Sequence, residues 1–143
     1  ALKYYEESLE ICKTHFNDKD NEYSALLLKN IGIVYNNLGD YPSALEMYTE
    51  SLEMKKRLYD NYDSSMADLL TKIADSHLKL GDYEKARNFY EMSLELRKEI
   101  YKKDNQDIAS NLFSIGITYD YAGEYGKSIE FYEKSLEIRK QLH

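Results

Sequence analysis

Apolar residues recur along the chain at spacings of three and four, in stretches of about four helical turns. Between residues 24 and 38, the small or apolar positions of this stripe are Leu28, Ile31, Gly32 and Tyr35. Such spacing places the side chains on one face of an α-helix, and that face must be covered by other elements. The same stripe returns 42 and 84 residues later. The three equivalent helices are expected over 24–38, 65–80 and 108–122.

A second kind of amphipathic stretch follows each of these helices. In its first copy, the expected buried face holds Ala44, Tyr48, Ser51 and Leu52. The equivalents in the next two copies are Ala86, Tyr90, Ser93 and Leu94, then Ser128, Tyr132, Ser135 and Leu136. The second helices are expected over 42–58, 84–101 and 126–142. The leading segment, residues 1–16, matches this second kind of helix alone, so the pattern predicts seven helices.

Residues with special backbone preferences separate the helices. A glycine follows each first helix, where a left-handed backbone would end it, and Pro42 falls in the first turn of the next helix. An Asn or Asp precedes each first helix and is predicted to cap it, a contribution of about 1 kcal/mol each. The predicted turn glycines are Gly39, Gly81 and Gly123, and the predicted caps are Asn21, Asp63 and Asn105.

Self-similarity at a fixed period of this length is typical of stacked helical repeats, in which each unit buries its apolar face against its neighbours. The chain is predicted to be one such array. Its parts are a half repeat over 1–20, consisting of a second helix only, and full repeats over 21–62, 63–104 and 105–143. The leading half repeat is offset by 43 residues rather than 42, which places one extra residue near 17–21. Because the chain opens in the middle of a repeat, we expect a longer parent protein.

Composition narrows the classes of partner. The 143 residues carry a formal net charge of −7, whereas a nucleic-acid binder normally presents a basic stripe to phosphates and a membrane-docking surface is basic too. No apolar run approaches the roughly 18 residues needed to cross a bilayer. The single cysteine, Cys12, permits no internal disulfide and favours a reducing, cytoplasmic compartment.

Signals of catalysis and of cofactor binding are absent from the sequence. It contains no glycine-rich phosphate loop, no paired cysteines at metal-ligand spacing and no nucleophile elbow. The three histidines are far apart, and His77 stands in a core tyrosine slot, where a buried, hydrogen-bonded side chain is expected. We therefore predict no enzyme activity, no cofactor and no metal.

The slots of each unit resemble the tetratricopeptide repeat. That motif combines a large apolar residue, a Leu/Ile-Gly/Ala pair and a tyrosine with Gly-x-Tyr at the turn, then Ala, Tyr/Phe and Ala/Ser in the second helix. The 42-residue period and the longer second helices resemble the kinesin-light-chain-type subclass, although His77 replaces a tyrosine. The resemblance implies a right-handed superhelical solenoid of antiparallel helix pairs. It also implies that the first helices line a concave groove that binds a peptide or partner domain.

On that arrangement, the groove receives the first-helix side chains that the repeat does not need for packing. Several are apolar, and a contiguous exposed apolar stripe usually marks an interface. Neighbouring repeats, or a segment outside this chain, could instead cover them. Tyr121 has no predicted packing role and is the foremost candidate for a binding hot spot. The predicted partner-binding residues are Leu26, Lys29, Asn30, Ile33, Asn37, Lys72, Asp75, Leu78, Lys79, Phe113, Ile117, Asp120 and Tyr121.

Two functions of different kinds remain open at this stage. The first is a scaffold or adaptor that binds a protein or peptide in the groove. The second is a structural spacer or a self-association segment of a larger protein, and that larger protein could have a signalling role. Self-association is considered because exposed solenoid ends tend to associate.

Overall fold

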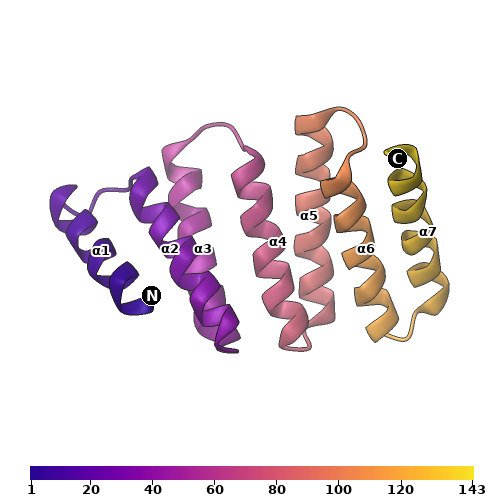
Figure 1. The fold of residues 1–143 in the computed structure, drawn as a ribbon, viewed down its shortest axis with the longest axis horizontal. Helices are drawn as coiled ribbons and strands as arrows, with labels where there is room; N and C mark the ends of the chain where they lie inside the picture. The colour runs from indigo at the N-terminus through magenta and orange to yellow at the C-terminus, as the bar shows by residue number, and fades with distance from the viewer. The chain divides into compact units, whose positions relative to one another are not determined.

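The computed structural model describes residues 1–143 and contains seven α-helices and no strands (Figure 1). This confirms the predicted all-α class and the number of helices. The helices fall into two compact units, residues 1–62 with α1 to α3 and residues 63–143 with α4 to α7. The helices are α1 (Leu2–His15), α2 (Glu22–Asn37), α3 (Tyr41–Leu58), α4 (Ser64–Lys79), α5 (Tyr83–Tyr101), α6 (Gln106–Tyr121) and α7 (Tyr125–Gln141).

The first helix of each full repeat begins at a side-chain cap. Asn21, Asp63 and Asn105 have extended backbones, and each accepts a hydrogen bond from the backbone N–H three residues ahead, at 2.8, 3.0 and 2.9 Å. The caps confirm the prediction and supply an acceptor for one of the unpaired N–H groups of the first turn.

The same helices end at a left-handed glycine, as predicted. Gly39, Gly81 and Gly123 have φ values of 80°, 83° and 79°. A residue without a Cβ atom adopts this conformation at little cost, so the chain reverses within a few residues and the second helix follows antiparallel to the first. Two left-handed residues, Asn17 (φ 53°) and Asp18 (φ 58°), lie in the longer connection after α1, where the extra residue was predicted.

In unit 1, α2 packs against both α1 and α3. Its stripe residues Leu28 and Ile31 are buried with Leu9 of α1 and Met54 of α3. In unit 2, α4, α5, α6 and α7 pack in sequence, each against the next (Figure 1). Tyr90 and Leu94 of α5 form one core with residues of α6, including Ile108, Leu112 and Ile115.

One hydrogen bond recurs in every helical hairpin. The hydroxyl of Ser51 donates to the carbonyl of Ala25 at 2.6 Å, that of Ser93 to Ala67 at 2.8 Å, and that of Ser135 to Ala109 at 2.7 Å. We call this the hairpin hydrogen bond. All three serines are buried, and the bond gives each hydroxyl the partner that a buried polar group requires.

A small residue at one slot of the first helix allows the second helix to approach closely. A Cβ atom placed on Gly32 would lie 2.6 Å from Cε1 of Tyr48, and one on Gly116 would lie 2.7 Å from Cδ1 of Tyr132. Glycine therefore lets the ring of the second helix rest on the backbone of the first. The middle repeat has Ala74 at this slot, next to Tyr90 in the core.

Two packing predictions were wrong. Leu136 was expected to be buried, but it is 52% exposed, whereas the equivalent Leu94 is 8% exposed. The reason is that α6 covers Leu94 through Ile108 and Leu112, while no helix packs on the corresponding face of α7. His77 is largely buried and stacks on Phe89, but its Nδ1 atom has no hydrogen bond and lies 3.6 Å from the carboxylate of Asp82.

Candidate partner-binding surface

The structure brings four of the predicted residues together in unit 2. Leu78 and Lys79 of α4 lie beside Ile117 and Tyr121 of α6 around an open hollow of about 510 Å³. The turn between α4 and α5 completes its lining with Leu80, Gly81 and Tyr83. We call the surface of α4 and α6 that carries Lys72, Asp75, Leu78, Lys79, Phe113, Ile117, Asp120 and Tyr121 the groove face of unit 2.

Tyr121 has a packing partner that the sequence did not reveal. Its ring stacks on Tyr83, with the ring centroids 5.3 Å apart and the planes 5° from parallel. The prediction that Tyr121 lacks a packing role was therefore wrong, although its side chain remains 64% exposed. The two stacked rings form an aromatic wall of the hollow. Tyr83 is the residue that sequence reasoning missed here, since it was assigned to the turn motif.

Phe113 lies further along α6 and is 41% exposed. Its ring contacts the ring of Tyr132 at 5.1 Å between centroids, and the guanidinium of Arg139 lies 5.4 Å from it. Because two residues of α7 hold this ring, Phe113 contributes to packing as well as to the exposed surface.

The carboxylates of α4 are engaged by α5. Asp68 pairs with the guanidinium of Arg97 at 2.7 Å, and the hydroxyl of buried Tyr90 donates a hydrogen bond to Asp75. Desolvation of the carboxyl group raises the pKa of Asp75, although the residue as a whole is exposed. Burial and the Asp75 carboxylate raise the pKa of Tyr90. The ammonium groups of Lys72 and Lys79 form no direct ion pair or hydrogen bond, although both lie near enough to Asp75 to oppose the rise in its pKa.

A buried cluster of polar side chains lies between the helices that carry this surface. Arg97 donates hydrogen bonds to the side chain of Asn111 as well as to Asp68, and Asn111 donates to the carbonyl of Tyr90 at 3.4 Å. Thr71 lies 2.9 Å from the hydroxyl of Ser93. The cluster joins α4, α5 and α6, so it fixes the two helices of the groove face against the same second helix.

In unit 1, the five predicted residues all lie on α2. Leu26 and Asn37 are exposed, while Lys29, Asn30 and Ile33 are partly buried. Unit 1 contains only one first helix, so within this unit the predicted surface is one side of a single helix.

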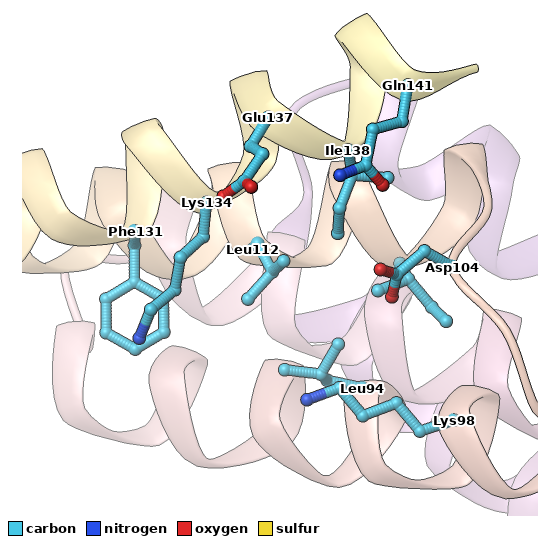
Figure 2. Close-up of a pocket in the computed structure, with 10 residues that line it drawn as sticks. Leu94, Lys98, Asp104, Leu112, Phe131, Lys134, Glu137, Ile138 and Gln141 are labelled. Carbon is cyan, nitrogen blue, oxygen red and sulfur yellow. The ribbon is translucent and has the colours of Figure 1, made fainter.

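A second hollow in unit 2, of about 380 Å³, contains none of the predicted residues (Figure 2). Its floor is apolar, with Leu94, Leu112 and Ile138, and its rim carries charges of both signs, including Lys98 and Glu137. The lining comes from α5, α6, α7 and the connection at Asp104. This hollow is therefore separate from the predicted partner-binding residues of the same unit.

None of the seven helices combines the length and the apolar character that crossing a bilayer requires. No three histidine, cysteine or carboxylate side chains gather where they could hold a metal ion.

The antiparallel hairpins, their repeated caps and their repeated hydrogen bonds define a helical-repeat protein. The chain matches the family model of the tetratricopeptide repeat over residues 1–57 and 65–141. It therefore belongs to the tetratricopeptide repeat family, as its sequence pattern predicted. Proteins of this family are generally non-catalytic interaction scaffolds. A comparison with curated proteins finds no detectable sequence relative.

Solved structures share the fold at low sequence identity. BtubC (BKLC) from P. vanneervenii is 20% identical, with a TM-score of 0.90 over 99% of this chain and 56% of its own. A putative kinesin light chain from Podosopora anserina, with nearly identical TPR-like repeats, is 11% identical, with a TM-score of 0.80 over 99% and 67%. The N-terminal domain of stress-induced protein-1 from C. elegans is 16% identical, with a TM-score of 0.65 over 80% and 84%. The chain thus spans little more than half of the BtubC chain, and these likenesses show the fold alone.

Proposed function

We propose that this chain is a protein-interaction scaffold that binds a peptide segment of a partner on the groove face of unit 2. The observation that carries the proposal is the hollow between α4 and α6. Leu78, Ile117 and Tyr121 leave apolar surface open there beside the unpaired cation of Lys79. Open apolar surface with a polar rim is typical of an interaction site. We infer a non-enzymatic adaptor that works in the cytoplasm, with neither nucleic acid nor membrane as its partner.

The predicted residues of α2 are proposed to extend the binding surface within unit 1. Leu26, Lys29, Asn30, Ile33 and Asn37 would supply mixed apolar and polar contacts. Because Asp75 is engaged by Tyr90, it is proposed to shape the groove face rather than to pair with a basic partner.

The test is a selection from a displayed random peptide library with the intact chain, followed by fluorescence anisotropy with the selected peptides. Tyr121→Ala and Leu78→Ala are each expected to weaken binding at least about tenfold, as truncation of a hot-spot side chain does. Tyr4→Ala is the matched control, because Tyr4 is a similarly exposed tyrosine of α1 (69% against 64%). Failure to select any peptide, or equal binding by the Tyr121→Ala variant, would overturn the proposal.

A further inference from the structure

The hollow beside Tyr121 lies between packed helices of unit 2. Its lining comes from α4, the turn after α4, the first residue of α5, and α6. Helix α5 packs against both α4 and α6, and α7 packs on α6 in turn. Even so, Tyr121 and Leu80 are 64% and 41% exposed. The apolar opening is therefore a property of the packed hairpins themselves.

The polar side chains in this lining supply hydrogen-bond donors. They are the ammonium group of Lys79 and the hydroxyl groups of Tyr83 and Tyr121. None of the three donates a hydrogen bond to another group of the protein. The lining contains no carboxylate and no side-chain amide, so the phenolic oxygens are its only side-chain acceptors. A ligand that suits this hollow presents carbonyl oxygens and few N–H groups.

The charges around the hollow balance one another. The groove face of unit 2 carries two lysines and two aspartates, and Lys79 lies close enough to Asp75 for their charges to interact. The whole chain has a net charge of −7, which disfavours an acidic peptide. A basic peptide would place its cations beside Lys72 and Lys79, and like charges across an interface are unfavourable. The balance therefore favours an uncharged ligand.

We propose that the hollow binds an uncharged, proline-rich segment of a partner in the polyproline II conformation. This rests on the proposed function and names the class of peptide that the groove face of unit 2 takes. Polyproline II has no internal hydrogen bonds, so its carbonyl groups are free to accept, and proline has no N–H that needs an acceptor. Proline-rich segments dock in grooves lined by aromatic side chains. Prolyl rings pack on the wall of Tyr83 and Tyr121, while Lys79 and the two hydroxyls donate to the carbonyls.

The size of the hollow suits a short part of such a segment. Its volume of about 510 Å³ lies within the range of sites that hold small ligands. One turn of polyproline II contains three residues and is about 9 Å long. A peptide of about nine residues therefore offers one complete turn to the hollow in any register.

The probe is a fluorescein-labelled peptide of about nine residues, in which two prolines and one leucine repeat in each turn. Two control peptides of the same length replace every proline with alanine or every leucine with glutamate. Fluorescence anisotropy with the intact chain is expected to show binding of the proline–leucine peptide at least about tenfold tighter than of either control. Equal or tighter binding of a control peptide contradicts the proposal, as does a Kd above about 1 mM for the probe.

Variants test the donors without disturbing the fold. Tyr121→Phe keeps the aromatic ring and removes one hydroxyl, so the Kd for the probe should rise about threefold to tenfold. Lys79→Met keeps an apolar side chain, removes the ammonium group and should have a similar effect. Tyr125→Phe is the matched control, because Tyr125 is also 64% exposed and lies outside the hollow. Unchanged binding by both Tyr121→Phe and Lys79→Met refutes the assigned donors, provided that circular dichroism shows folded helices.

The peptide selection separates failure of this inference from failure of the groove face. Enrichment of proline among the selected peptides supports the inference. Selected peptides that lack proline, yet lose affinity for the Tyr121→Ala variant, keep the groove face as a binding site and refute the polyproline ligand. If no peptide binds, both proposals fail.

Discussion

Replacement of Gly32 by alanine sets two known effects against each other. In a helix interior, alanine is about 1 kcal/mol more favourable than glycine. The new Cβ atom, however, would lie 2.6 and 2.7 Å from two ring carbons of Tyr48, whose side chain is 2% exposed. Inserting a group into such a packed site typically costs about 1–3 kcal/mol. The net expectation is a loss of stability of about 1 kcal/mol.

Urea unfolding followed by circular dichroism measures the effect. With an m value of about 2 kcal/mol per molar, a loss of about 1 kcal/mol lowers the midpoint by about 0.5 M. Gly126→Ala is the control, because nothing lies within 4 Å of a Cβ atom at that position of α7. There only the helix preference acts, so stability should rise by a few tenths of a kcal/mol, up to about 1 kcal/mol.

The reverse change, Ala74→Gly, tests whether the Tyr90 ring packs specifically against the methyl group of Ala74. It should cost about 1 kcal/mol of helix preference and about 0.8 kcal/mol of lost apolar burial next to Tyr90. If Gly32→Ala instead stabilised the chain as much as Gly126→Ala, the Tyr48 ring would move freely and the close-contact argument would be refuted.

Three further changes test the support of the groove face. Arg97→Met should destabilise the chain by about 2 kcal/mol, because it leaves the buried oxygen of Asn111 without its charged donor; a change in the urea midpoint near zero would contradict this. Burial raises the pKa of Asp75 above 3.8, so the folded chain binds this proton more tightly than the unfolded chain, and stability falls as pH rises through that raised pKa. Asp75→Asn should remove this fall in urea unfolding from pH 4 to 7, and parallel curves would refute it. Asn105→Ala should cost about 1 kcal/mol of cap energy in thermal unfolding, and an unchanged Tm would show that the cap contributes nothing.

The helices could be predicted from the sequence because their causes are local. Caps, turn glycines and apolar stripes act within a few residues, so the pattern located Asn21, Gly39 and the serine of each second helix correctly. The close approach at Gly32 could be predicted for the same reason, since it follows from the size of one residue at a repeated slot.

The details of the groove face could not be predicted in this way. The stacking of Tyr83 on Tyr121 joins residues 38 positions apart, and it depends on how one hairpin is offset against the next. The Asn111 contact of Arg97 occurs at one junction only, because the equivalent slot holds Leu69 one repeat earlier. The exposure of Leu136 was not predicted, because the repeat pattern assumes that a neighbouring helix covers the second helix of each repeat.

The hairpin hydrogen bond has a consequence for how such chains change in evolution. Its donor and acceptor are 26 residues apart and belong to one hairpin in every case, from Ser51–Ala25 to Ser135–Ala109. Duplication or deletion of a whole 42-residue segment therefore creates or removes a complete bond and never orphans a buried hydroxyl. Arrays of this kind can lengthen and shorten by genetic recombination without first acquiring compensating substitutions inside the surviving hairpins.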